Sequence, residues 1–422
     1  MVEIRKPIAV SEAVRSALAE VRPLEAEKAP LSECDGRVLA EAVQADHDEP
    51  PFDRSPYDGF AVRAEDTTGA SVEGPVELKV IEEIAAGDVG RERIGKAEAA
   101  RIMTGAPIPE GADAVVMLEH VEETKHDGGE PYILVPNAYR AGDNISRQGE
   151  DTAEGTVQVE KGTVVTSGVK AVLATFGYAE VEVARRPVVG IFATGTELLD
   201  VAEEVVPGKI RNSNAYTLAA QVRQVGAEAR YYGILKDDFD LCYEAVRGAL
   251  DEVDVLVTTG GASVGDYDYL QEIFRKLDAE VCFNKVAMRP GSVTTVAKWQ
   301  GKTLFALSGN PSACFVGFEL FTRPVLRTML GAKRPYLQKT EAVLEKDFPK
   351  ANPFTRFTRA KVDFHAGKLY AKPVGLDKSN AVTPLAHANA FIVLPGGTKG
   401  YEKGSAVDVL LLNGEDEQWT VS

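Results

Sequence analysis

Apolar strands that alternate with amphipathic helices between residues 187 and 331 constrain the fold more than any other feature of the sequence. Near-continuous apolar segments such as VVGIFATG, VDVLVTTGG and TLFALSG are separated by helical patterns over 214–225, 239–250 and 267–277. Strands that are apolar along their whole length are typical of a mostly parallel sheet with helices on both faces. The sequence therefore predicts a three-layer α/β/α domain that ends in a long helix over 310–329 and binds its ligand at the carboxyl ends of the strands.

The remainder of the chain predicts three further domains. Residues 1–45 are interpreted as helix-rich and residues 152–184 return to a helical pattern, so these two segments are expected to pack together as one domain. Short strands and turns over 46–151 predict a β-domain inserted between them. Residues 185–331 form the α/β domain, and over 332–422 helical periodicity disappears in favour of short strands, which predicts a small C-terminal β-barrel.

Composition and charge exclude several classes of protein. The 422 residues are 44% apolar, which is typical of a globular chain with several domains. The net charge of −17 argues against nucleic-acid binding, which needs basic surfaces. No apolar run approaches the roughly 20 residues that cross a bilayer, and no signal peptide is evident. The four cysteines are scattered, as expected in a reducing compartment. We therefore expect a cytoplasmic protein with no membrane segment.

Glycine-rich sequences follow three strands of the predicted sheet, ATGTE at 193–197, TTGGASVGDYD at 258–268 and LSGNPS at 307–312. Glycines allow backbone N–H groups to approach a ligand, and helix N-termini favour anions. Taken alone, each loop is explained as well by an ordinary strand-to-helix turn as by a ligand-binding role. Three such loops in one sheet favour a phosphate-binding site, although neither a Walker A motif nor GxGxxG after a strand is present.

Carboxylates lie at the same predicted edge of the sheet: Glu197, Asp237, Asp238, Asp266 and Asp268. Acidic side chains repel a phosphate unless a cation lies between them, and Mg²⁺ prefers carboxylate and phosphate oxygens. Each acid taken singly is more simply a solvated loop residue. The group as a whole predicts a divalent metal.

Basic residues near this edge are candidates for binding an anion. Lys285 and Arg289 are four residues apart in NKVAMRPG and could face one cleft, and Arg211, Arg356 and Arg359 could join them. The alternative for each is a solvated surface position. Asp58 in SPYDGF is explained by an ordinary β-turn, and Thr104 in MTGAP by an ordinary loop. These patterns alone give no reason to assign either residue a functional role.

Seven sequence strings together resemble the molybdopterin molybdenumtransferases, which are the MoeA family and include the gephyrin E-domain. The strings are SPYDGFAV, RIMTGAPIPEGADAVVM, GDNISRQGED, FATGTEL, TTGGASVGDYD, KVAMRPG and LSGNPSACFVGFELF. They occur in the order and at the spacings of the family, over essentially the whole chain. TTGGxSxGxxD alone indicates the wider molybdopterin-binding fold. The strings that contain PYDGFAV and RIMTGAPIP narrow the resemblance to the molybdopterin molybdenumtransferases.

The resemblance implies a reaction and an assembly. Adenylylated molybdopterin and molybdate are the expected substrates, molybdenum cofactor and AMP are the expected products, and Mg²⁺ is the expected cofactor. A homodimer is expected, with each cleft between the α/β domain of one subunit and the β-domain of the other. Molybdopterin adenylyltransferase and proteins that mature molybdoenzymes are candidate partners.

The resemblance also assigns site residues by motif position. The residues at the positions of the family's catalytic residues are Asp58, Thr104, Asp151, Glu197, Asp237 and Asp268. The expected metal ligands among them are Glu197, Asp237 and Asp268. Substrate binding falls on Gly260, Gly261, Ser263, Gly265, Lys285, Arg289, Ser308, Gly309, Asn310, Pro311 and Arg359.

Three positions depart from the family pattern. Ser308 occupies a position where many members have proline, and Ser292 one where a second lysine often occurs. Arg289 replaces a lysine, which keeps the charge but changes the hydrogen-bonding geometry. The departures bear on the anion contacts and leave the reaction class unchanged.

Two alternatives belong to other classes. A scaffold of the gephyrin type is disfavoured by the intact set of acids and by the lack of a fused second enzyme domain or long disordered linker. An adenylyltransferase or nucleotide hydrolase of the same fold is disfavoured by the PYDGFAV and MTGAPIP segments.

Overall fold

The computed structural model describes residues 6–236, 238–260, 269–349, 353–419 and 421. The chain forms two compact units. The first unit combines Met1–Glu41, Lys161–Lys170 and Glu180–Ser422, and the second combines Ala42–Glu160 and Ala171–Ala179. Each unit has hydrophobic clusters of its own.

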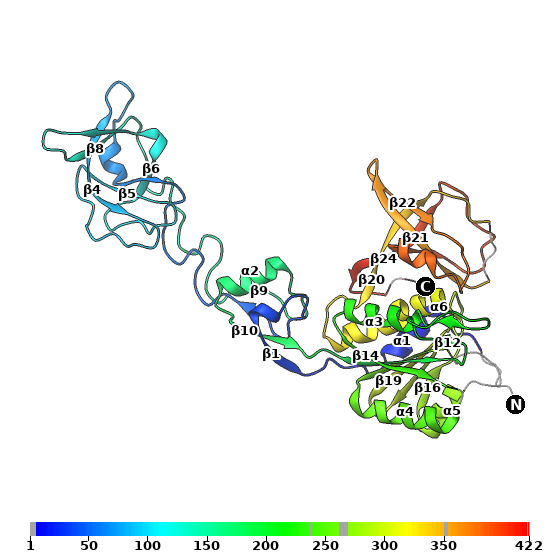
Figure 1. Ribbon diagram of the computed structural model, residues 1–422. Coiled ribbons are helices and arrows are strands. Elements are labelled where there is room, and N and C mark those ends of the chain that lie inside the picture. The colour runs from blue at the N-terminus through cyan, green and yellow to red at the C-terminus, as the bar shows by residue number, and fades with distance from the viewer. Residues whose placement is uncertain (1–5, 237, 261–268, 350–352, 420, 422) are drawn as a thin grey trace. The chain divides into compact units, whose positions relative to one another are not determined.

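A six-stranded sheet lies at the centre of the first unit (Figure 1). Its strands, in spatial order, are β14 (Glu228–Leu235), β11 (Val188–Thr194), β15 (Val255–Thr259), β19 (Lys302–Leu307), β18 (Thr295–Trp299) and β16 (Glu280–Phe283). The first four strands are parallel, and the last two are antiparallel to their neighbours. The predicted mostly parallel sheet is therefore confirmed.

Helices cover both faces of this sheet. Figure 1 shows α4 (Phe239–Glu252) and α5 (Tyr269–Lys276) below the sheet and α3 (Asn214–Gln224) above it. One hydrophobic cluster joins α4 and α5 to one face of the sheet, and another joins α3 and α1 (Val10–Leu18) to the opposite face. The three helices predicted after the strands are confirmed. The ends of α3 and α4 and the last residue of α5 lie within two residues of the prediction, and the predicted start of the third helix at 267 lies outside the described residues.

The predicted long helix over 310–329 is not a single α-helix. It consists of α6 (Pro311–Gly317), a π-helical turn η4 (Phe318–Thr322) and α7 (Arg323–Met329). Glu319 of the π turn is buried and accepts a hydrogen bond from Gln221 Nε2 of α3 at 2.7 Å. The wider turn thus occurs where the helix meets a buried polar contact.

The N-terminal part of this unit contains less helix than the sequence predicts. Among the described residues 6–45, α1 is the only α-helix, so the helix-rich description is not confirmed. The other elements are η1 (Leu31–Glu33) and β1 (Ala26–Pro30), which pairs with β10 (Glu180–Ala184).

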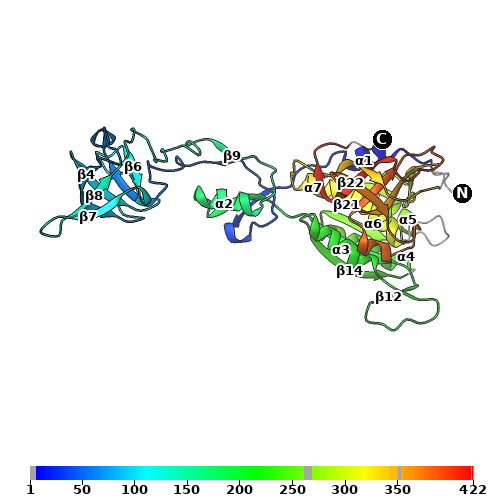
Figure 2. The same ribbon diagram turned by 90° about the horizontal axis from the view of Figure 1, so that it is seen from above.

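A short parallel pair, β12 (Leu198–Leu199) with β13 (Ile210–Arg211), flanks a loop that extends away from the central sheet (Figure 2).

A second six-stranded sheet forms the C-terminal part of the first unit. Its strands, in order, are β17 (Met288–Arg289), β21 (Thr355–His365), β22 (Lys368–Pro373), β20 (Tyr336–Leu344), β24 (Ala406–Asp416) and β23 (Ala390–Leu394), with η5 (Thr383–His387) before β23. β23 also pairs with β21, so the last five strands pair in a ring. The apolar pattern of the segment VCFNKVAM favours a single strand of the α/β domain, and this expectation is wrong. The segment is instead divided between β16 and β17, and β17 pairs with β21.

The second unit is built around a third six-stranded sheet. Its strands, in order, are β6 (Ala114–Met117), β3 (Gly59–Val62), β5 (Glu98–Ile102), β4 (Val76–Ile84), β8 (Pro131–Val135) and β7 (Glu122–Lys125). The shorter elements nearby are β2 (Val43–Gln44), which pairs with β9 (Val157–Val159), and the turns η2 (Ala64–Thr67) and η3 (Leu118–His120). Two hydrophobic clusters fill the unit. The helix α2 (Ser167–Thr175) follows β9 along the chain.

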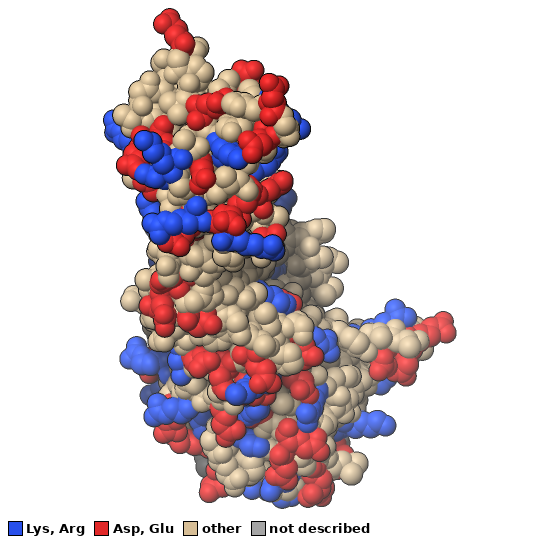
Figure 3. All heavy atoms as spheres, turned by 90° about the vertical axis from the view of Figure 1, so that its left-hand side faces the viewer, with Lys and Arg blue, Asp and Glu red and all other residues tan. Residues whose placement is uncertain are grey.

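Charged side chains of both signs occur on the surface. On the face drawn in Figure 3, acidic and basic residues are interspersed. Within the described part of the chain, no helix has both the length and the apolar character that a membrane span needs.

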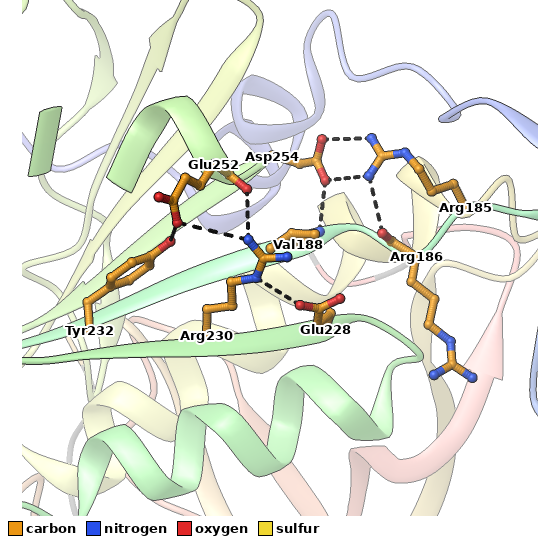
Figure 4. Close-up of polar contacts among 8 residues, drawn as sticks. All are labelled: Arg185, Arg186, Val188, Glu228, Arg230, Tyr232, Glu252 and Asp254. Atoms are coloured by element: carbon orange, nitrogen blue, oxygen red, sulfur yellow. Dashed lines mark hydrogen bonds and ion pairs between the residues drawn. The ribbon is translucent and has the colours of Figure 1, made fainter. Parts of the chain in front are cut away.

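A network of ion pairs and hydrogen bonds joins the amino ends of the central strands (Figure 4). Asp254, which precedes β15, accepts hydrogen bonds from Arg185 Nη1 and Nη2 at 2.9 and 2.8 Å and from Val188 N at 2.8 Å. Burial raises the pKa of the Asp254 carboxyl, but the bonds from Arg185 and Val188 outweigh burial, so the pKa lies below its usual value. The network is at the opposite end of the strands from the glycine-rich loops.

Replacing this carboxylate should destabilise the first unit. Asp254→Asn is expected to lower the free energy of unfolding by about 1–3 kcal/mol at neutral pH, because half-buried Arg185 loses its charged partner. Since folding lowers the pKa, the stabilisation is present above the unfolded pKa of about 3.9 and is lost as the pH falls through the folded pKa. Urea unfolding of the purified variant at several pH values measures both effects.

Asp251→Asn is the matched control. Asp251 forms an exposed ion pair with Arg247 one helical turn away, and solvent weakens such a pair, so its loss should change the stability little. Equal losses in the two variants would contradict the role assigned to Asp254.

Candidate functional site

The glycine-rich loops meet at the carboxyl ends of β11, β15 and β19, because these strands are parallel neighbours. Gly260 has a φ of +90°, and a Cβ atom at this position would lie 2.2 Å from Thr194 O. A Cβ atom on Gly309 would lie 3.3 Å from Gly260 Cα. The backbones therefore approach one another more closely than a side chain at position 260 would permit.

Asn214 connects the loops through its side chain. This first residue of α3 is buried, and its Nδ2 donates hydrogen bonds of 2.8 Å to Thr259 Oγ1 and to Gly309 O. Thr259 Oγ1 in turn donates to Ser308 O at 3.2 Å. The helix and two strand ends are thus held as one polar structure.

A small cavity of about 60 Å³ lies at this junction. It is lined by Thr194, Glu197, Leu198, Ile210, Arg211, Asn212, Ser213, Asn214, Thr259, Gly309 and Pro311. Glu197 is exposed and folds back over its own loop, since a Cβ atom on Gly195 would lie 2.3 Å from Glu197 Oε2. Its carboxylate is the type of oxygen ligand that Mg²⁺ prefers.

A larger cavity of about 580 Å³ lies beside the same β19–α6 loop. Its lining residues are Arg289, Pro290, Gly291, Ser292, Val293, Ser308, Asn310, Ala313, Arg356, Arg359, Asp377, Lys378 and Ser379. Four of these carry a positive charge and one carries a negative charge. Both departures from the family pattern that involve serine, Ser292 and Ser308, line this cavity.

The arginines of the larger cavity come from adjacent strands. Arg289 of β17 is the register partner of Arg356 of β21. Asp377 Oδ2 accepts a hydrogen bond from Arg356 Nη1 at 2.8 Å, and Asp377 Oδ1 lies 3.6 Å from Arg359 Nη1. Burial lowers the pKa of Arg359, which is 1% exposed, although Asp377 opposes the shift. A guanidinium with so high an ordinary pKa remains charged.

Several predicted site residues do not line these cavities. Lys285 is half-buried next to β17, and its carbonyl accepts a hydrogen bond from Ile8 N at 3.1 Å. Asp58, Thr104 and Asp151 lie in the second unit and are exposed.

Asp58, which directly precedes β3, and Thr104, which follows β5, form a close pair. Asp58 Oδ1 accepts hydrogen bonds from Thr104 N at 2.7 Å and from Thr104 Oγ1 at 2.8 Å. The backbone bond first, and then the hydroxyl bond, lower the pKa of the Asp58 carboxyl. Asp151 takes part through its backbone, with its N–H donating to Glu49 O at 3.0 Å.

Five predicted site residues lie outside the described residues: Asp237, Gly261, Ser263, Gly265 and Asp268. The described neighbour Asp238 caps α4 by accepting a hydrogen bond from Leu241 N at 3.0 Å. Among the residues that the structure describes, no group of three or more histidine, cysteine, aspartate or glutamate side chains gathers as a metal site.

The sequence did not single out Asp377, Lys378 and Ser379. They lie in the loop after β22, in a segment (LDKSN) that resembles an ordinary polar turn. The pairing of Asp377 with Arg356 and Arg359 depends on contacts across the C-terminal sheet, and no local pattern in the sequence signals it.

Three family models match the chain in order. The models are described as "MoeA N-terminal region (domain I and II)" over residues 8–177, "Probable molybdopterin binding domain" over 190–328 and "MoeA C-terminal region (domain IV)" over 341–412. Together they cover most of the sequence, including both cavities.

Relatives and solved structures match along the whole chain. A Bacillus subtilis protein named molybdopterin molybdenumtransferase is 56% identical, over 100% of this chain and 98% of the relative. A Staphylococcus epidermidis protein of the same name is 48% identical, over 97% of both chains. A crystal structure of a molybdopterin biosynthesis MoeA protein from Pyrococcus horikoshii OT3 matches with a TM-score of 0.82 at 33% identity, over 96% of this chain and 100% of that chain.

The contact between Asp58 and Thr104 predicts how the pKa of Asp58 responds to a substitution of Thr104. Thr104→Val removes the hydroxyl donor and keeps the backbone donor, so the pKa of Asp58 should rise and still remain below its usual value. Carboxyl-carbon NMR titration of Asp58 in wild type and variant measures this shift. An unchanged Asp58 pKa in Thr104→Val would show that the hydroxyl contributes nothing to it.

Proposed function

Because the chain belongs to the MoeA family of molybdopterin molybdenumtransferases, we propose that it inserts molybdenum from molybdate into adenylylated molybdopterin with release of AMP, and that Mg²⁺ is required. Membership of the family, and with it the class of transferase, was predicted from the sequence and is confirmed. The observation that carries the proposal is that the loop from Ser308 to Pro311 borders both cavities, one with a carboxylate and one with a cluster of cations.

The larger cavity suits an oxyanion. Molybdate and a phosphoanhydride are both anionic, so bringing them together requires positive charge at the site. Arg289 and Lys378 are exposed, and neither has an ion pair with any residue that the structure describes. Ser308 and Asn310 supply neutral polar groups to the same wall. Lys285 is proposed to add charge at the rim.

The smaller cavity suits the metal. The Glu197 carboxylate has no ion pair with any residue that the structure describes. We assign Asp237 and Asp268 as further ligands on their motif positions alone, since both lie outside the described residues. Bound Mg²⁺ would neutralise charge on the phosphate as AMP leaves. The hydrogen bonds of Asn214 to Thr259 and Gly309, and the close approach of Gly260 to Thr194, hold the strand ends beside Glu197.

The second unit is proposed to complete the site in a homodimer. The family resemblance implies a cleft shared between subunits, so Asp58, Thr104 and Asp151 would act at the site of the partner subunit. The pair formed by Asp58 and Thr104 keeps this carboxylate ionised, as a group that orients a metal or a proton donor must be.

We propose four domains for the chain. They comprise residues 1–45 with 152–184, 46–151, 185–331 and 332–422, and the ring of strand pairs supports a β-barrel for the last. A cytoplasmic location and substrate supply by an adenylyltransferase are proposed on the same resemblance.

Purified protein incubated with adenylylated molybdopterin should release AMP only when molybdate and Mg²⁺ are both present. Omission of molybdate tests the transfer, and EDTA treatment followed by readdition of Mg²⁺ tests the metal. AMP release at an undiminished rate after thorough chelation would contradict the metal role. ATP consumption with molybdopterin would instead indicate an adenylyltransferase.

Glu197→Gln should lower the rate of molybdate-dependent AMP release by roughly 10², or about 3 kcal/mol in the barrier, as expected for the loss of one preorganised electrostatic group. The concentration of Mg²⁺ needed for half-maximal rate should rise. Glu204→Gln, in the exposed loop that follows, is the matched control and should keep the wild-type rate. A wild-type Mg²⁺ dependence in Glu197→Gln would remove this residue from the metal site.

A further inference from the structure

Asp377 lies between two arginines that line the larger cavity. Its side chain is 12% exposed, and those of Arg356 and Arg359 are 11% and 1% exposed. Asp377 Oδ2 binds Arg356 Nη1 at 2.8 Å and Asp377 Oδ1 lies 3.6 Å from Arg359 Nη1, so one carboxylate contacts both guanidinium groups. Contacts of this kind are little weakened by solvent, because all three side chains are largely buried.

The loop that carries Asp377 is fixed from two sides. Arg359 Nη2 donates to Leu376 O at 2.9 Å and to Lys378 O at 3.2 Å, which joins the loop to β21. Ser312 N of α6 donates to Ser379 O at 3.0 Å, which joins the loop to the helix after β19. Asp377 is therefore held in place by both the C-terminal sheet and the α/β layers.

The strand register brings two like charges together beside Asp377. Arg289 and Arg356 are register partners in the parallel pair of β17 and β21, and like charges repel each other. Asp377 neutralises Arg356 and leaves Arg289 exposed toward the cavity. Arg356 also lies over the ring of Phe348, 5.7 Å from its centroid, which further restricts it.

We propose that Asp377 is a positioning residue for the oxyanion substrate, which holds Arg356 and Arg359 so that the cavity receives a tetrahedral dianion. This proposal rests on the proposed function and adds a residue that touches the arginines and not the substrate. Arg289, Arg356, Arg359 and Ser379 then form the wall that faces the oxyanion. A guanidinium needs a fixed orientation to offer two parallel N–H groups to an oxyanion, and a carboxylate on its other side supplies that orientation.

Positioning and simple charge make opposite predictions for Asp377→Asn. The substitution removes one negative charge from the cavity, so charge alone would strengthen binding of a dianion. The amide retains one oxygen acceptor but cannot accept from both arginines without presenting its NH₂ group to a cation. Positioning therefore predicts weaker binding in spite of the higher positive charge.

The experiment measures the molybdate KM, the kcat of AMP release and the Kd of molybdate by calorimetry for the full-length protein and its variants. Asp377→Asn should raise the KM and Kd for molybdate about tenfold, as expected for the loss of a charge-assisted hydrogen bond, while the KM for adenylylated molybdopterin stays within about twofold. Asp377→Glu should restore molybdate binding in part. Asp363→Asn, which removes an exposed carboxylate on β21, is the matched control and should change neither constant.

The outcomes separate this inference from the proposed function. Unchanged or tighter molybdate binding by folded Asp377→Asn overturns the positioning role, and so does an equal rise in the KM of both substrates. Wild-type protein that binds molybdate without releasing AMP would overturn the proposed function. In that case the molybdate Kd of Asp377→Asn, compared with that of the wild type, would still test the role of Asp377. Should Asp377→Asn not fold, Arg356→Lys replaces it. This variant keeps the charge and loses the planar fork, so the molybdate KM should rise, and an unchanged KM would overturn the proposal.

Discussion

The close approach of three backbone segments at the carboxyl ends of β11, β15 and β19 is the constraint on which the site depends. Gly260 can lie against Thr194 O only because it has no Cβ atom, and its φ of +90° is unfavourable for other residues. This approach lets Asn214 reach both Thr259 and Gly309 with one amide group. Strand parallelism supplies the common edge, and the absence of a side chain at Gly260 allows the neighbouring backbones to approach there.

Charge distribution is the second organising factor. The chain carries 64 acidic and 47 basic residues, yet four of its cations line one cavity beside the β19–α6 loop. An acidic protein can attract an anionic substrate only where it concentrates positive charge locally. The two cavities place cations on one side of this loop and a carboxylate on the other.

Local patterns in the sequence were sufficient to predict much of the fold. The helices α3, α4 and α5 and the parallel strands between them have apolar periodicity and turn residues that do not depend on distant contacts. The strand β17 was misplaced because its partner β21 is more than 60 residues away, and register across such a distance leaves no local signal. The π turn at η4 was missed for a similar reason, since it coincides with a contact to Gln221 on another helix.

The candidate site was predicted unevenly for the same physical reason. Arg289, Ser308 and Asn310 lie in motifs that adjoin the strand ends, and the structure brings them to one cavity with Arg359. Asp377 could not be found from sequence, because its importance comes from two buried arginines on β21. The roles of Asp237 and Asp268 rest on their motif positions alone.

The proposed function couples loss of AMP to transfer of molybdenum onto the pterin. The most direct measurement is the amount of molybdenum bound to the released pterin, determined by elemental analysis and compared with AMP formed in the same reaction. Coupled transfer predicts equal amounts of pterin-bound molybdenum and AMP throughout the time course. AMP that accumulates while the pterin remains free of molybdenum would contradict it.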